Sequence, residues 1–228
     1  MMAIKLTSAD TDANNFMSYC WSKLYNMRFL PTVLLITFSS AQLNAQKIDS
    51  PYVAPYFLPT PNGYTTEVIP FPIEFAPSIN YNGVEDLRFT AGWGNAATED
   101  YWSYAFLWWL DGSPGINEDT VTNNLKTYYS GLVGRNIKPR NIPENKIVPV
   151  QVKVTSATLT PGDVQTFEGA VYMLDYMQQE PITLHVRVHV RTCGDNKTVV
   201  FNEISPQPYT SPTWEKLDDI WNGFRCSK

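Results

Sequence analysis

The stretch GWGNAATEDYWSYAFLWWLDG, from Gly92 to Gly112, holds four tryptophans, two tyrosines and one phenylalanine and ends in Asp-Gly. Aromatic side chains are enriched in β-strands and Asp-Gly is a turn signal, so the composition favours a strand that ends in a turn. With a period of two, both faces are apolar, which indicates a strand covered on both sides by other elements. The faces would be Trp102, Tyr104, Phe106, Trp108 and Leu110 on one side and Tyr101, Ser103, Ala105, Leu107 and Trp109 on the other.

A helix is the alternative for this stretch, because a helical spacing also groups Trp102, Ala105, Phe106 and Trp109. Under the strand interpretation we expect the large aromatics to be structural. Aromatic residues at strand spacing pack into a sheet core more often than they form a carbohydrate-binding platform.

Trp93 stands apart from this strand, between two glycines in GWGN. We expect its indole to be accessible in a loop. Glu99, Asp100 and Asp111 flank the strand and could add polar contacts. A ligand-binding rim in this stretch would therefore consist of Trp93, Glu99, Asp100 and Asp111.

Upstream, residues 51–77 contain seven prolines, each of which removes a backbone donor, so this region is extended and not a central strand throughout. TTEVIPF, within it, could still pair as a short edge. VEDLRFTAGW, from Val84, alternates like a half-buried strand. We predict a proline-rich extended segment over 46–80 and a single α+β domain over 81–228.

Downstream, INEDTVTNNLKTYYSGLVG is predicted to be an amphipathic helix with Asn117 as its cap and Gly134 as its end. Four strand candidates follow: VPVQVKVTSATL, QTFEGAVYMLDYM, ITLHVRVHVRTC and KTVVFNEISP. SPTWEKLDDIWNGFRC is predicted to be a helix capped by Ser211, with Pro212 in its first turn. This order indicates an α+β fold, an antiparallel sheet of about six strands with two amphipathic helices packed on it.

The carboxyl-terminal run VVFNEISPQPYTSPTWEKLDDIWNGF takes a last strand through a proline-marked loop into a helix that ends near a phenylalanine. This arrangement resembles the PsbP-like α/β/α sandwich of photosystem extrinsic subunits and Ran-binding relatives. The resemblance concerns the topology of residues 84–226 and carries over no functional residue. It implies a non-catalytic accessory or interaction protein, because the known relatives mostly bind partners.

A secretory signal peptide is predicted over residues 27–45. From Met27 the chain reads MRFLPTVLLITFSSAQLNAQ, with one arginine, an apolar run and a small, polar end. The apolar run of about ten residues is too short to span a bilayer. Cleavage after Ala41 or Ala45 fits the pattern, and we favour Ala45, which leaves Gln46 as the first mature residue.

Residues 1–26 precede this signal peptide. We interpret them as a non-native upstream extension, with translation starting at Met27; a genuine long amino-terminal region with dispersed Lys5 and Lys23 is the alternative. The mature protein would then be secreted or periplasmic, with no integral membrane segment after signal cleavage.

Export gives the cysteines a structural meaning. Cys20 lies in the upstream extension, which leaves Cys193 and Cys226. Two cysteines in an exported domain allow one disulfide, between the end of a strand and the end of the last helix. A metal site is the poorer alternative, because structural zinc needs four ligands and the chain has only two histidines.

The strand candidate TLHVRVHVRT places His185, Arg187, His189 and Arg191 on one face. This stripe could hold an anionic ligand or an acidic partner. The alternative is a solvated sheet face paired to Glu168 or Glu203. The two histidines would be about 13 Å apart along a strand, too far to bind one metal together, so we predict no metal site and no cofactor.

Composition and motifs reduce the number of function classes that fit this sequence. The net charge of −5 argues against a nucleic-acid surface. The chain contains no nucleophile elbow, phosphate-binding glycine loop, dinucleotide fingerprint or zincin motif. We therefore favour an exported, non-catalytic accessory protein that binds an unidentified protein or small molecule. The alternative is a small secreted hydrolase that acts on glycans, using Trp93 with Glu99, Asp100 or Asp111.

Overall fold

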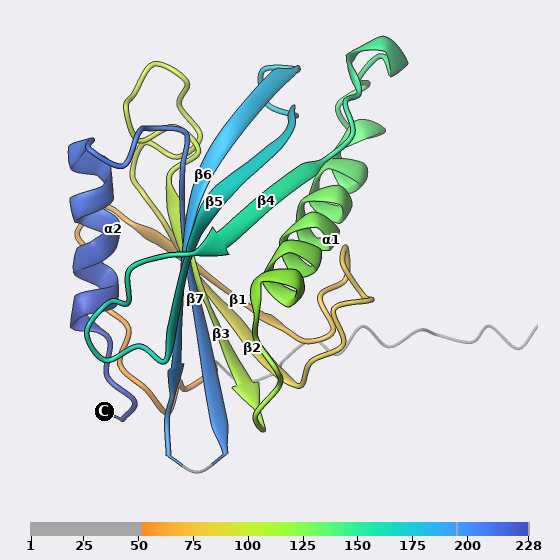
Figure 1. The fold of residues 1–228 in the computed structure, drawn as a ribbon. Coiled ribbons are helices and arrows are strands. Elements are labelled where there is room, and N and C mark those ends of the chain that lie inside the picture. The colour runs from red at the N-terminus through yellow and green to blue at the C-terminus, as the bar shows by residue number, and fades with distance from the viewer. Residues whose placement is uncertain (1–51, 195, 228) are drawn as a thin grey trace, which may run out of the picture. The chain divides into compact units, whose positions relative to one another are not determined.

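The computed structural model describes residues 52–194 and 196–227, so the predicted extension over 1–26 and signal peptide over 27–45 lie outside the described residues. The described chain forms one seven-stranded sheet in the order β1-β2-β3-β7-β6-β5-β4, and every neighbouring pair is antiparallel. Two helices pack on opposite faces of this sheet (Figure 1). The strands are β1 (Thr65–Pro70), β2 (Gly83–Phe89), β3 (Tyr104–Asp111), β4 (Gln151–Ser156), β5 (Gln165–Asp175), β6 (Glu180–Thr192) and β7 (Lys197–Ser205); the helices are α1 (Glu118–Ile137) and α2 (Pro212–Gly223), with a short 3-10 turn at Glu144–Lys146.

The predicted α+β class with two helices on an antiparallel sheet is confirmed, but the expected number of strands was one too low. The additional strand is β1, which pairs with β2 at the edge of the sheet. It comes from the proline-rich segment, where TTEVIP lies between prolines. Pro70 is the last residue of β1. Proline has no backbone N–H, and this is tolerated here because β1 lies at the edge of the sheet.

The aromatic strand β3 lies inside the sheet, between β2 and β7. Seven of its eight residues are buried, with only Asp111 exposed, so the predicted strand covered on both faces is confirmed. The even-numbered side chains face α1, and the odd-numbered ones face α2. The α1-facing core includes Tyr104, Phe106, Trp108 and Leu110, and the α2-facing core includes Ala105, Leu107 and Trp109.

Residues on both sides of β1 also belong to the folded unit. Tyr56 and Leu58 are buried in the core under α2, and Ile73 is buried under α1. Phe57 forms a two-hydrogen-bond bridge with Arg225, at N–O distances of 2.9 and 3.0 Å. The segment before residue 81 combines the strand β1 with turns near residues 73–79, and it contributes to both cores.

Helix α1 begins as predicted at the Asn117 cap, whose side chain accepts a hydrogen bond from the backbone of Thr120 at 2.9 Å. The prediction that Gly134 ends this helix is wrong. The helix continues to Ile137, and Lys138 after it still has right-handed helical dihedrals. The extra turn is retained because Ile137 packs against the core.

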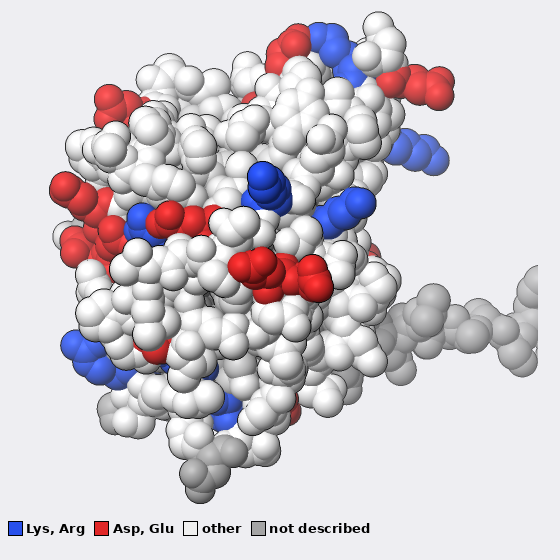
Figure 2. Space-filling view, in the orientation of Figure 1, with Lys and Arg blue, Asp and Glu red and all other residues white. Residues whose placement is uncertain are grey.

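Helix α2 begins as predicted, with Ser211 as cap and Pro212 in the first turn. Its apolar side chains pack on the sheet. The Cys193–Cys226 disulfide, with Cα atoms 5.3 Å apart, joins the end of β6 to the chain just after α2 and confirms the predicted bridge. On the face in Figure 2, charged groups of both signs are scattered over a mostly uncharged surface.

Candidate ligand-binding site

The connection between β2 and β3, residues 90–103, is held by its own hydrogen bonds. The hydroxyl of Thr90 donates to the carbonyls of Asp100 and Ser103, at 3.1 and 2.8 Å. The hydroxyl of Thr98 donates to the carbonyl of Gly92 at 3.1 Å. A Cβ at Gly92 would come within 2.4 Å of that hydroxyl, so this close turn requires glycine. The result is an ordered loop that fixes its two tryptophans.

Trp93 and Trp102 face each other from the two ends of this loop. The backbone amide of Trp102 donates to the carbonyl of Trp93 at 3.0 Å, and the ring centroids are 5.9 Å apart. Trp102 is fully buried and has a φ of 55°, a left-handed conformation that a bulky residue rarely adopts. Such conformations persist where the surroundings enforce them, and they gather at ligand sites.

A cavity of about 260 Å³ opens beside these two indoles, between strands β1 to β3 and helix α1. Most of its lining residues are aromatic or aliphatic, and Glu67, Arg135 and Asn136 add charged and amide groups. The lining residues are Glu67, Ile69, Phe75, Leu87, Phe89, Trp93, Trp102, Tyr104, Tyr128, Leu132, Arg135, Asn136 and Tyr176. We call this cavity the aromatic pocket.

Two hydrogen-bond donors of the aromatic pocket are unsatisfied. The indole nitrogens of Trp93 and Trp102 are buried, and neither has a partner among the described residues. An indole N–H can only donate, and leaving such a donor buried and unpaired costs about 1–3 kcal/mol. The hydroxyls of Tyr104 and Tyr129, by contrast, bond each other at 2.7 Å behind the pocket wall. A third buried indole N–H without a partner among the described residues belongs to Trp108, which does not line the pocket.

Charged residues occur only on the exposed side of the aromatic pocket. Glu67 and Arg135 are exposed, and the Arg135 guanidinium lies 5.3 Å from the ring centroid of Phe75. Glu67 is the only carboxylate among the lining residues. The pocket thus combines an apolar body with buried donors and a polar entrance, as small-molecule sites do.

A larger hollow of about 580 Å³ lies between the start of α1 and strands β4 and β5. It is lined on one side by exposed polar residues of the helix, and its acid Glu118 already accepts two hydrogen bonds from Ser156 at 2.7 Å. This hollow is more open than the aromatic pocket, which makes it a poorer binding site.

The predicted rim around Trp93 is only partly assembled. Trp93 is half-buried and packs on Phe89 at a centroid distance of 4.8 Å, so it forms a pocket wall and not the freely accessible indole we expected. The glycines on either side of Trp93 allow its indole to be exposed but do not require it. Packing against neighbouring aromatic side chains keeps the ring half-buried.

The three acids predicted for the rim do not line the aromatic pocket. Glu99 is exposed, and Asp100 pairs with Lys216 of α2 at 2.9 Å. Asp111 lies at the opposite end of β3 and pairs with Lys197. The structure therefore brings none of these carboxylates to the cavity beside Trp93.

The predicted basic stripe on β6 is only partly solvated, because α2 lies over much of it. His189 is buried, and His185, Arg187 and Arg191 are half-buried. Arg187 bonds Glu168 at 2.9 Å and lies 3.5 Å from Glu203, as the alternative had proposed, and it also bonds Asp218 of α2 at 2.6 Å. His185 contacts the ring of Tyr209 at 5.3 Å.

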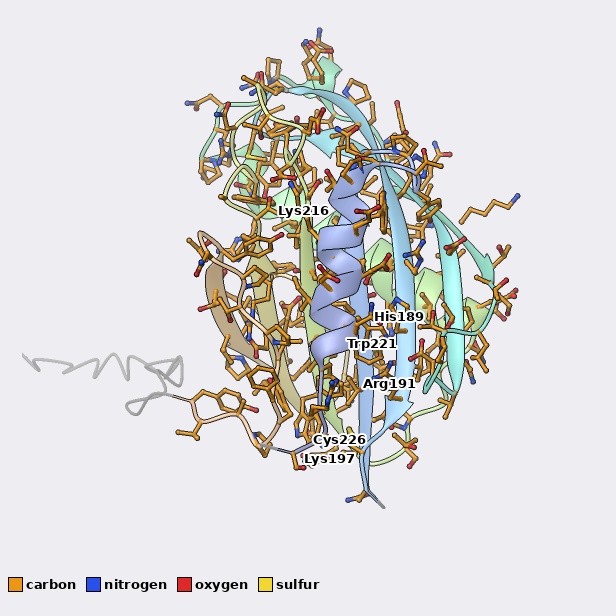
Figure 3. The ribbon with its side chains drawn as sticks, turned by 90° about the vertical axis from the view of Figure 1, so that its left-hand side faces the viewer. His189, Arg191, Lys197, Lys216, Trp221 and Cys226 are labelled. Carbon is orange, nitrogen blue, oxygen red and sulfur yellow. A yellow bond between two sulfur atoms is a disulfide. The ribbon has the colours of Figure 1, made fainter. Side chains whose placement is uncertain are left out.

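His189 and Arg191 share one buried acid, Asp163, at 2.6 and 2.8 Å. Both side chains lie beside Trp221 (Figure 3), and the Arg191 guanidinium stands 3.9 Å from its ring centroid. Burial lowers the pKa of His189, but the neighbouring carboxylates of Asp163 and Glu203 outweigh it and raise the pKa overall. The connected charges under α2, which we call the α2-side network, are Asp163, Glu168, Arg187, His189, Arg191, Glu203 and Asp218.

Two acids are fully buried: Glu203, which the sequence suggested as a partner on a solvated face, and Glu85, which sequence reasoning missed. Glu203 lies under α2, where burial raises its pKa. Glu85 lies under α1 opposite Trp108, and burial raises its pKa to about 8. A signal existed for Glu85, because its parity in VEDLRF matches that of Leu87, which is on the core face.

Comparisons with known proteins leave the family open. No family model matches the chain, and no curated protein matches it. A crystal structure of LpqN, which is involved in cell envelope biogenesis of Mycobacterium tuberculosis, matches with a TM-score of 0.33 and 13% sequence identity, over 75% of this chain and 82% of that chain. A likeness at this TM-score supports no conclusion about function. None of the described helices is long and apolar enough to cross a membrane.

Proposed function

We propose that this is an exported, non-catalytic binding protein whose aromatic pocket holds a small, mostly apolar molecule with a hydrogen-bond acceptor. The observation that carries the proposal is the pair of buried, unpartnered indole N–H groups of Trp93 and Trp102 beside a cavity of about 260 Å³. An acceptor atom on the ligand would satisfy a donor that the protein leaves unpaired.

The size and wall of the pocket limit the ligand. Its volume is slightly below the range of about 300–1,000 Å³ found for drug-sized ligands, so a one- or two-ring compound fits best. Aromatic walls favour a flat ligand that can stack or meet a ring edge-on. Of the two charges at the entrance, Arg135 can pair with an anionic acceptor of the ligand, whereas Glu67 would repel it.

The lining residues also favour binding over glycan hydrolysis. A glycosidase generally needs two carboxyl groups that flank the bond to be broken. Glu67 is the single carboxylate of the aromatic pocket, and Glu99, Asp100 and Asp111 all lie outside it. The hydrolase alternative therefore has no acid–base pair at this cavity.

Export is supported by the Cys193–Cys226 disulfide, a bond typical of oxidising compartments. Amino-terminal analysis of the protein from its native compartment should give Gln46 as the first residue. Retention of Met1 or Met27 would refute this part of the proposal.

Calorimetric titration with 2-naphthoate and 2-methylnaphthalene tests the pocket, because the two probes share a ring system and differ in the acceptor group. We expect 2-naphthoate to bind the wild type more tightly, by about tenfold for one charge-assisted hydrogen bond. Trp93→Phe should reduce this preference while keeping the ring. Leu132→Trp, which fills the cavity, should abolish binding of both probes.

The matched control is Trp109→Phe, on the α2-facing side of β3, which should leave both affinities unchanged. Equal binding of 2-naphthoate by wild type and Leu132→Trp would place the ligand elsewhere. Absence of binding by the wild type to either probe, and to a panel of one-ring aromatic acids, would overturn the proposal.

A further inference from the structure

His189 is held in one tautomer by the most heavily bonded acid of the α2-side network. Asp163 accepts hydrogen bonds from Thr166 at 3.0 Å, Arg191 at 2.8 Å and Trp221 at 3.1 Å. An acid with so many donors is an ionised acceptor, so Nδ1 of His189, 2.6 Å from it, bears a proton. The other ring nitrogen, Nε2, then has a lone pair available in the neutral imidazole.

That nitrogen faces a second atom without a partner. Nε2 of His189 and Oε1 of Glu203 are both buried, lie 3.6 Å apart and form no hydrogen bond with any described residue. A carboxylate oxygen of Asp218 lies within 4.8 Å of both. We propose that His189, Glu203 and Asp218 bind one zinc ion, on the opposite face of the sheet from the aromatic pocket.

The distance between His189 and Glu203 fits the ion. Zinc binds imidazole nitrogen at about 2.0–2.1 Å and carboxylate oxygen at about 2.0–2.2 Å, so two ligands of a tetrahedral site stand roughly 3.4 Å apart. The observed 3.6 Å between His189 and Glu203 needs only a small adjustment. The buried pair Asp163–His189 also supplies the carboxylate–histidine arrangement that orients metal-binding imidazoles.

The charges of the network favour a divalent cation. Its four carboxylates and two guanidinium groups leave two negative charges when His189 is neutral. A proton on His189 would neutralise only one of them, whereas one zinc ion neutralises both. Nitrogen and oxygen ligands of this kind suit zinc better than calcium or magnesium, which prefer oxygen alone.

Arg187 is the neighbour that most opposes a cation, and its position limits this effect. It bonds Oδ1 of Asp218 and lies near Oε2 of Glu203, so Oε1 of Glu203 stays free to face His189. The Asp218 side chain is 39% exposed, so it gives an entry path and room for a water as the fourth ligand. The ion would join α2 to β6 and β7.

The test is zinc binding by the folded mature protein after treatment with a chelator, measured by competition with a chromophoric zinc indicator. We expect one ion per chain and a rise in the thermal midpoint on zinc addition. His189→Gln should weaken zinc affinity by more than about 100-fold, beyond the loss usual for residues that only orient ligands. Asp218→Asn, on the exposed side of the site, serves if His189→Gln does not fold.

His185→Gln is the matched control, because it changes a histidine on the same strand and the same face that lies outside this cluster. It should retain wild-type zinc affinity. Wild-type protein that binds no zinc would overturn the proposal, as would equal affinities for wild type and a folded His189→Gln or Asp218→Asn variant. Equal loss in the His185→Gln control would place the zinc elsewhere.

Discussion

Glu85 gives the sharpest test of the packing under α1. Its side chain is fully buried, and neither carboxylate oxygen has a hydrogen-bond partner that meets normal geometry. Burial raises its pKa from 4.5 to about 8, and the nearby Tyr128 and Trp108 offset this only in part. Between these two values the folded protein keeps a proton that the unfolded chain releases, so the free energy of unfolding falls as pH rises.

The magnitude follows from that difference in pKa. At 1.36 kcal/mol for each pKa unit, the change from 4.5 to about 8 corresponds to about 5 kcal/mol of lost stability once the pH exceeds 8. Glu85→Gln keeps the shape of the side chain and has no proton to lose. We expect the variant to match the wild type at about pH 4 and to exceed its stability by several kcal/mol at about pH 9.

Urea unfolding followed by tryptophan fluorescence, repeated across this pH range, measures the difference directly. Glu74→Gln is the control, because that acid is exposed and should leave the pH dependence unchanged. Identical pH dependence in wild type and Glu85→Gln would refute the reasoning. So would a variant that is less stable than the wild type at about pH 9, since it would show that the ionised acid is stabilising.

Three further changes test the fold. Replacing both cysteines of the Cys193–Cys226 disulfide by serine should cost about 3–4 kcal/mol in denaturant unfolding, given the sequence separation of 33 residues; an unchanged midpoint would contradict this. Trp108→Ala should cost about 3–5 kcal/mol and the half-buried Trp93→Ala less, whereas equal losses would show that both are core. Gly131→Ala should lower the thermal midpoint because its Cβ would come within 1.8 Å of a backbone carbonyl, while Gly134→Ala, with open space around it, should raise it by helix propensity; a higher midpoint for Gly131→Ala would count against the close contact.

The sequence predicted a structural feature correctly where the residues of that feature alone indicate how it is buried or paired. β3 was predictable because both of its faces are apolar, and only a strand in the interior of a sheet buries both. The disulfide was predictable because two cysteines allow one pairing. The edge strand β1 was less so, because the surrounding prolines hide a short pairing segment.

The candidate sites could not be predicted because their parts come from distant segments. The aromatic pocket needs the left-handed conformation of Trp102 and a wall from α1, neither of which has a local pattern. Asp163 lies in a turn 26 residues before His189 and looks solvated in sequence. The charged stripe on β6 was interpreted as exposed because the sequence does not show that α2 covers it. Nor does the sequence show that Asp218 of α2 pairs with Arg187.

The disulfide that closes the chain after α2 also determines how the domain would respond to mechanical force. Tension applied at residue 227 passes through Cys226 directly to Cys193, so β7 and α2 lie in a covalently closed loop and bear no load along the chain. The first contact to resist is the Phe57–Arg225 bridge, whose two hydrogen bonds lie next to that junction. The chain between Cys193 and Cys226 cannot extend until the disulfide is reduced. Its extended length is about 110 Å, for 33 residues at about 3.4 Å each. Single-molecule pulling with and without reductant would reveal this as a difference in unfolded length.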